Sequence, residues 1–174
     1  MQACFAAVDY GYPWSELLGD YKFRRRTGLS TLFAGLLLQT PGVRECLASL
    51  SPKDLLLPLP LSTQRLADRG FNQAWELARA LHRASRCQGR LHARLLLRLR
   101  HTQAQSELPR AERLGNVRGA FRVEPALSHL LHGRQVVLVD DVMTSGATLS
   151  AASLALLEAG ALGVQAIVVA RTPP

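Results

Sequence analysis

Short apolar runs alternate along the chain with stretches in which apolar residues recur at helical spacing. Residues 55–61, 136–139 and 164–170 are the clearest runs, and Pro58 and Pro60 interrupt the first of them. Continuous apolar runs of this length are typical of strands buried on both faces of a sheet, and proline stops further ladder pairing. These runs therefore predict buried strands, the first of which leads into a rigid loop.

Helical spacing of apolar residues predicts helices between the runs. The predicted inner faces lie in residues 29–37, 43–50, 74–85 and 149–156. Thr40 followed by Pro41 predicts the start of the second of these helices, and Asn72 predicts the N-cap of the third. Strands that alternate with helices predict an α/β fold with a mostly parallel sheet flanked by helices, Rossmann-like in arrangement.

The remaining segments have weaker patterns. Residues 4–14 mix apolar and aromatic side chains and predict either a strand or an extended arm, and residues 90–100 alternate in part, which predicts another strand. Phe121 and Val123 predict a short extended piece. Residues 101–109 are polar without a periodic apolar face, which predicts a loop.

The chain is strongly basic, and most of its positive charge is arginine. It has 21 Lys+Arg against 13 Asp+Glu, a formal net charge of +8, with lysine at positions 22 and 53. This balance favours polyanionic partners, either nucleic acid or phosphorylated small molecules, unless it reflects an arginine-rich proteome. In residues 22–26 basic side chains stand beside Tyr21 and Phe23, which fits either a solvated helix start or a contact with single-stranded nucleic acid.

Length and residue usage predict one domain, residues 1–174, in a reducing compartment. Cys4, Cys46 and Cys87 are far apart, which speaks against a zinc ribbon and against a disulfide framework. The histidines have no metal-ligand spacing, so no protein-held metal is predicted. No apolar run is long enough to span a membrane and no signal-peptide pattern is evident, which predicts a cytoplasmic protein without a membrane span.

Residues 136–148 combine an apolar strand, two adjacent acids and a small polar turn that leads into a helical pattern. Asp140 and Asp141 follow the strand, and the turn consists of Thr144, Ser145, Gly146, Ala147 and Thr148. Backbone N–H groups at such a helix start cradle an anion. Carboxylates accept hydrogen bonds from vicinal hydroxyls or face a hydrated magnesium ion, so the segment predicts a sugar phosphate site. The alternative is a surface turn with capping residues, but a turn needs one cap and two adjacent carboxylates repel.

This segment resembles the phosphoribosyl-pyrophosphate signature of type I phosphoribosyltransferases, in which an apolar strand, two acids and a Thr-Thr/Ser-Gly-x-Thr turn follow one another. A narrower resemblance, to the ComF/GntX-type family, covers residues 10–172. Besides the acid pair it is carried by residues 58–61, Arg65, residues 69–73, Arg98, Thr102, Gln105, Leu108, Arg113, Asn116, Val117 and residues 119–121. Members of that family commonly begin with a four-cysteine zinc-binding module, which this sequence does not contain, so a short form or a missing N-terminus is expected.

The resemblance implies a type I phosphoribosyltransferase-like fold that binds phosphoribosyl pyrophosphate or a similar sugar phosphate, with substrate-bound Mg²⁺. Asp140 and Asp141 would be catalytic and bind the ribose hydroxyls, and residues 144–148 would hold the 5′-phosphate. Arg65 and Arg69 would bind pyrophosphate, unless they belong to an ordinary solvated face. The 101–109 loop would close over the site, unless it is a plain surface loop. A homodimer also fits the family.

The sequence leaves three functions open. The first is a magnesium-dependent phosphoribosyltransferase whose acceptor the sequence does not identify. The second, implied by the resemblance, is a non-catalytic protein that keeps the pocket and acts in DNA uptake and utilisation through competence proteins. The third is direct binding of single-stranded DNA through arginines in the second half of the chain, namely Arg98, Arg100, Arg110, Arg113 and Arg118.

Overall fold

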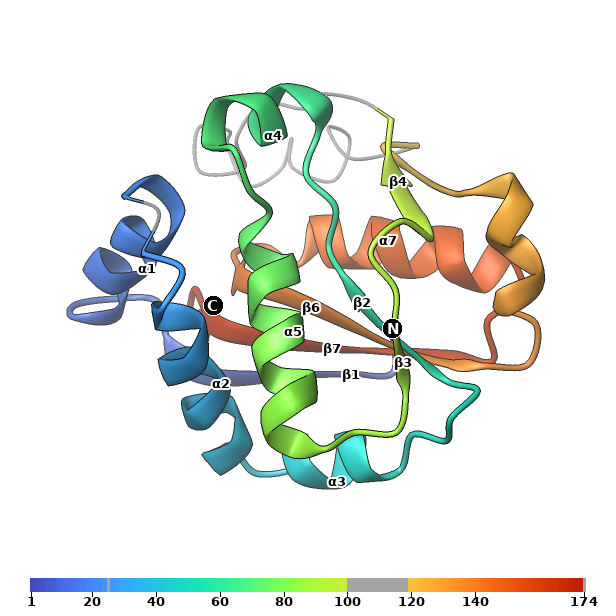
Figure 1. The fold of residues 1–174 in the computed structure, drawn as a ribbon, viewed down its shortest axis with the longest axis horizontal. Helices are drawn as coiled ribbons and strands as arrows, with labels where there is room; N and C mark the ends of the chain where they lie inside the picture. Colours follow the sequence, from blue (N-terminus) through green and yellow to red (C-terminus); the bar gives the residue numbers. More distant parts are fainter. Residues whose placement is uncertain (25, 100–118, 174) are drawn as a thin grey trace.

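A five-stranded sheet forms the centre of the computed structural model, which describes residues 1–24, 26–99 and 119–173 (Figure 1). The strand order is β1-β7-β6-β2-β3, and each pair of neighbours is parallel. The strand bounds are β1 Ala3–Asp9, β2 Leu55–Pro58, β3 Arg90–Leu91, β6 Gln135–Met143 and β7 Gly163–Arg171. The α/β fold with a parallel sheet, predicted from the sequence, is therefore confirmed.

Helices cover both faces of this sheet. One face carries four helices, α1 (Trp14–Phe23), α2 (Leu29–Gln39), α3 (Val43–Ala48) and α5 (Gln73–Ser85). The other face carries α7 (Ala147–Glu158), a 3₁₀ helix (Pro125–Leu130) and an antiparallel ribbon of β4 (Leu96–Arg98) and β5 (Phe121–Val123). Among the described residues no helix is both long and apolar enough to cross a membrane.

Consecutive residues of the central strands point to opposite faces, so both faces need apolar side chains. In β6, Val136 and Leu138 belong to the core beneath α7, whereas Val137 and Val139 belong to the core beneath α2 and α5. This alternation explains why the strand sequences are uninterrupted apolar runs.

Several local predictions are confirmed. Asn72 caps α5, because its Oδ1 accepts hydrogen bonds from the backbone N–H groups of Ala74 at 2.9 Å and Trp75 at 3.4 Å. The Asn72 side chain also donates to the Leu59 carbonyl at 3.1 Å, which ties the start of α5 to the end of β2. Residues 4–14 begin as strand β1, the first of the two predicted alternatives.

The helix predicted to start at Thr40-Pro41 starts at Val43 instead. Thr40 ends α2, where its Oγ1 donates a hydrogen bond to the Leu36 carbonyl at 3.2 Å, so it does not cap the next helix. Gly42 precedes α3 with a φ of +83°, a left-handed conformation that glycine adopts without strain.

Two further segments differ from their predictions. The polar stretch after β2 is not a loop throughout but contains the helix α4 (Thr63–Arg69), whose N-cap Ser62 accepts a hydrogen bond from the Arg65 N–H at 3.4 Å. Residues 90–100 do not form one strand, because β3 pairs with β2 while β4 pairs with β5 in the separate ribbon. Alternation alone does not reveal where an extended segment changes partner.

We expect Gly42→Ala to destabilise the fold, because an added Cβ at a φ of +83° would lie 2.5 Å from the Phe5 ring. The free energy of unfolding in urea should fall by about 1–3 kcal/mol. Gly35→Ala is the matched control, since Gly35 lies inside α2 and an added Cβ there meets nothing within 4 Å. That change should stabilise by roughly 0.5–1 kcal/mol, and equal effects of the two changes would contradict the prediction.

Candidate functional site

The carboxyl ends of β2 and β6 open into a cavity of about 660 Å³. Among the described residues, side chains from α1, α4, α5, β4 and the start of α7 also line it, as does Tyr10 after β1. Ligands of parallel α/β sheets bind at this edge. Residues 59–61 and 140–144 meet there. Thr172 lies at the same edge, where its N–H donates to the Met143 carbonyl, but it is not part of the described lining.

The two adjacent acids at the end of β6 have different surroundings. By strand alternation Asp141 follows Val137 and Val139 toward the α5 side, and it is only 3% exposed. Asp140 lines the same cavity and is partly exposed to it. Its Oδ1 accepts a hydrogen bond from the Asp141 N–H at 2.9 Å. The two carboxylates are nevertheless close enough to interact, since both line the same cavity and the charge of Asp141 acts on Asp140.

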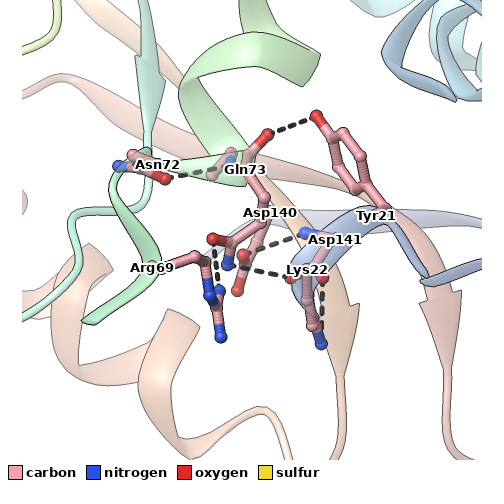
Figure 2. A network of polar contacts seen from close by, with 8 residues as sticks. Tyr21, Lys22, Arg69, Asn72, Gln73, Asp140 and Asp141 are labelled. Carbon is pink, nitrogen blue, oxygen red and sulfur yellow. Dashed lines mark hydrogen bonds and ion pairs between the residues drawn. The ribbon is translucent and has the colours of Figure 1, made fainter. Parts of the chain in front are cut away.

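Asp141 is held by side chains from two helices (Figure 2). Lys22 Nζ, from the last turn of α1, lies 2.9 Å from Asp141 Oδ2. Gln73 Nε2, from the first residue of α5, donates a hydrogen bond to Asp141 Oδ1 at 3.5 Å. The side chain of Lys22 is 21% exposed and that of Asp141 is 4% exposed, so this ion pair is largely removed from water.

The protonation preferences of the two acids shift in opposite directions. Burial by itself would raise the pKa of Asp141, but the charge and hydrogen bond of Lys22 outweigh it and hold that pKa below its ordinary value. Burial lowers the pKa of Lys22, and Asp141 raises it by more. Burial, followed by the negative charge of Asp141, raises the pKa of Asp140 well above its ordinary value. Asp140 therefore holds a proton more tightly than Asp141 does.

Gln73 connects the acid pair to the cationic wall of the cavity. Its Oε1 accepts a hydrogen bond from Arg69, and its backbone carbonyl accepts one from the Tyr21 hydroxyl at 2.7 Å (Figure 2). The guanidinium of Arg69 also stacks over the Phe23 ring, 5.3 Å from its centre. One network thus joins the end of α1, the end of α4 and the start of α5 beside the acids.

The predicted phosphate turn lies at the N-terminus of α7. Thr144, Gly146 and Thr148 line the cavity, and Gly146 has a φ of +75°, which turns the chain from β6 into the helix. The Ser145 side chain is exposed and its Oγ accepts a hydrogen bond from the Ala147 N–H at 3.4 Å, while the Ala147 side chain is buried in the core. Two threonines and the helix N-terminus thus lie where an anion is favoured.

Within the part of the chain that the structure describes, four cationic side chains line the cavity, namely Lys22, Arg65, Arg69 and Arg98. The structure therefore brings both predicted pyrophosphate arginines, Arg65 and Arg69, to the acid pair. Arg98, from β4, stacks on Phe121 with 5.4 Å between its guanidinium and the ring centre. Burial, then the charge of Arg65, lowers the pKa of Arg98. Arginine forks suit phosphate oxygens, so this wall is built for a polyanion.

Among the described residues no group of three or more His, Cys, Asp or Glu side chains could hold a metal ion. Asp141 is engaged by Lys22, which leaves Asp140 as the acid of the pair that is not ion-paired to a lysine. This donor set does not form a protein cage for a metal. It does fit Mg²⁺ that arrives on a phosphorylated ligand and takes most of its oxygen ligands from that ligand and from water.

Sequence interpretation missed Lys22, Gln73 and Tyr21 as parts of the site. Residues 22–24 end α1 rather than start a helix, and Lys22 turns inward to Asp141, so the prediction of a solvated helix start is wrong. The available signal was a lone lysine in an arginine-rich segment. The predicted 101–109 lid and the DNA-binding candidates Arg100, Arg110, Arg113 and Arg118 lie outside the described residues.

Known proteins resemble this chain over most of its length. Residues 78–173 match the family model of the phosphoribosyl transferase domain. The chain is 34% identical over 171 residues to DNA utilization protein YhgH of Escherichia coli (strain K12), covering 98% of this chain and 73% of that protein. It is 30% identical over 156 residues to competence protein F of Haemophilus influenzae, covering 90% and 67% of the two chains. It is 38% identical over 106 residues to competence protein ComFC of Bacillus subtilis, covering 61% and 39%.

We expect Lys22→Met to destabilise the protein by about 3 kcal/mol at pH 7, because it leaves the buried Asp141 carboxylate without its cation. The lowered pKa of Asp141 means that its stabilising contribution is present above the unfolded value of about 3.9 and is lost as pH falls through the lower folded value. The deficit of the variant should therefore shrink as the pH falls below about 4, measured by urea unfolding at several pH values.

Lys53→Met is the control for this change, because Lys53 is the other lysine and is exposed. Its effect should stay within about 0.5 kcal/mol at every pH. A similar cost at positions 22 and 53 would contradict a stabilising Lys22–Asp141 pair.

Asp140→Asn should stabilise the protein, in contrast to Lys22→Met. Because the folded pKa of Asp140 is raised, its ionised form opposes folding at neutral and alkaline pH, and protonation relieves this as pH falls. Asparagine imitates the protonated acid, so the melting temperature should rise at pH 8, and the gain should vanish below about pH 4. A lower melting temperature at pH 8 would show that the charged Asp140 is stabilising and would contradict the prediction.

Proposed function

Because the chain belongs to the ComF-type family of phosphoribosyltransferase-like proteins, we propose that its cavity binds phosphoribosyl pyrophosphate or a related ribose 5-phosphate ligand. The observation that carries the proposal is the convergence of an acid pair, a helix N-terminus and four cationic side chains on one cavity of about 660 Å³. A volume in this range suits a small-molecule ligand. Phosphoribosyl pyrophosphate has the complementary groups, which are a terminal phosphate, vicinal hydroxyls and a pyrophosphate.

Each part of the ligand has a counterpart in the cavity. In this proposal the 5′-phosphate binds at the N-terminus of α7, where residues 144–148 offer backbone N–H groups and threonine hydroxyls. Asp140 accepts hydrogen bonds from the ribose hydroxyls. Arg65 and Arg69 bind the pyrophosphate from α4. Mg²⁺ belongs to the substrate complex, where it offsets the pyrophosphate charge and takes most of its oxygen ligands from the substrate and from water.

The chemistry open to such a site is transfer of the phosphoribosyl group. The bond between the anomeric carbon and the pyrophosphate oxygen breaks, pyrophosphate leaves with the bonding electrons, and a nucleophilic acceptor forms the new bond at that carbon. The negative charge of Asp140 would stabilise the positive charge that develops on the ribose, and the arginines would stabilise the departing pyrophosphate. A non-catalytic sensor would use the same contacts without an acceptor.

The relatives' names connect the proposal to DNA. DNA utilization protein and competence protein are the names of similar chains, so we propose that the ligand-bound protein acts in DNA uptake or utilisation. Competence proteins as partners and a homodimer stay predictions.

Direct binding of single-stranded DNA is the second candidate. It is favoured by the end of α1, where the Phe23 ring is 75% exposed beside Arg24 and Arg26, a combination suited to base stacking and phosphate contact. Anisotropy with a labelled single-stranded oligonucleotide across a salt series would distinguish the two, because DNA affinity falls steeply with salt. Competition by phosphoribosyl pyrophosphate would indicate a shared site.

Calorimetric titration with phosphoribosyl pyrophosphate and Mg²⁺ tests the proposal. We expect a Kd on the order of micromolar for the wild type and a loss of roughly tenfold or more in Asp140→Asn, because the ribose loses a charged hydrogen-bond acceptor. Glu158→Gln is the control, since Glu158 is exposed at the other end of α7 and should leave the Kd unchanged. No heat of binding with folded wild-type protein would refute the proposal and direct attention to DNA and protein partners.

A further inference from the structure

The two acids of β6 differ in how far a ligand can reach them. Asp140 is partly exposed to the cavity, whereas Asp141 is 3% exposed and both of its carboxylate oxygens are engaged. A ribose hydroxyl that bound Asp141 would have to displace either Lys22 or Gln73 from a buried carboxylate. Leaving a buried charge unpaired is costly, so the geometry is unsuited to two equal ribose contacts.

Asp141 fixes the direction of the Gln73 side chain. A carboxylate only accepts hydrogen bonds, so it selects the amide nitrogen of Gln73, and the amide oxygen must then point the other way. That oxygen accepts the hydrogen bond from Arg69, whose guanidinium only donates. The charge of Asp141 thus determines, through one amide, that Gln73 presents an acceptor to Arg69.

Asp141 also holds Lys22 at the cavity. The ammonium lies 2.9 Å from Asp141 Oδ2 and its side chain is 21% exposed, so it is anchored and still reachable from the cavity that it lines. In Figure 2 the side chains of Lys22 and Arg69 flank the two acids, one from α1 and the other from α4. Burial lowers the pKa of Arg69, and the negative charge of Asp141 opposes that shift.

We infer that Asp141 is a positioning residue, which holds Lys22 directly and Arg69 through Gln73 so that these two cations bind the pyrophosphate, while Asp140 contacts the ribose hydroxyls. The inference rests on the proposed function and divides the acid pair between two parts of the ligand. It adds Lys22 to the pyrophosphate-binding residues and removes Asp141 from the ribose contacts.

Two partial ligands separate the roles of the two acids. Ribose 5-phosphate carries the hydroxyls but no pyrophosphate, and magnesium pyrophosphate carries no ribose. Asp141→Asn should weaken magnesium pyrophosphate about tenfold or more and leave ribose 5-phosphate within about twofold of wild type, because a lost charge loosens the cations. Asp140→Asn should instead weaken ribose 5-phosphate about tenfold or more and leave magnesium pyrophosphate within about twofold of wild type. Both affinities are measured by calorimetry with the full chain.

A second variant protects the test against a folding defect. Lys22→Met/Asp141→Leu replaces the ion pair by apolar side chains, an exchange that proteins often tolerate because no buried charge is left alone. It should lose magnesium pyrophosphate binding about as much as Lys22→Met does, and it should keep ribose 5-phosphate binding. Lys22→Arg, which keeps the cation, should recover most of the pyrophosphate affinity.

Each result decides between the alternatives. Selective loss of ribose 5-phosphate in the Asp141 variants would make Asp141 a ribose ligand and overturn the inference. Equal weakening of both ligands would assign Asp141 a purely structural role and overturn it as well. If the wild type binds neither partial ligand nor phosphoribosyl pyrophosphate, the proposed function itself fails. If the wild type binds them and the Asp141 variants bind them equally well, the inference about Asp141 fails and the proposed function stands.

Discussion

A carboxylate buried at the end of a parallel strand stays charged only if a cation is brought to it, and in this protein that cation is Lys22. The ion pair between Lys22 and Asp141 joins the last turn of α1 to the central strand β6 across most of the chain. Because Gln73 shares the same carboxylate, the start of α5 is fixed with it. The walls of the cavity are therefore arranged around one buried negative charge.

The neighbouring acid, Asp140, has its pKa shifted in the opposite direction. Asp140 is the preceding residue of the strand, and burial, followed by the negative charge of Asp141, raises its pKa. A residue whose ionised form is disfavoured by the fold has free energy to gain from a ligand that brings hydroxyl donors or a metal ion.

The sequence predicts the strands of the sheet and the polar residues at its edge better than it predicts the segments that connect strands and helices. The runs at 136–139 and 164–170 specify buried strands because both faces of a parallel strand must be apolar, and Asn72 marks a helix start because its side chain caps backbone donors. Thr40 misleads, because a threonine near a proline can end one helix as readily as begin another. Lys22 is missed for a different reason, since local pattern carries no information about a partner that tertiary folding brings to it.

The position of the first strand has a consequence for how the molecule folds. β1 lies at the sheet edge and pairs with β7, the last strand of the chain, and β7 in turn pairs with β6. The N-terminal strand therefore has no partner in the sheet until the C-terminal strand has formed, and α1, which carries Lys22, follows it directly. Contacts so distant along the chain are slow to form because a long loop must close first. We therefore expect the side of the cavity that carries Lys22 to assemble late in folding, so that an incompletely folded chain would retain its acids without their cation.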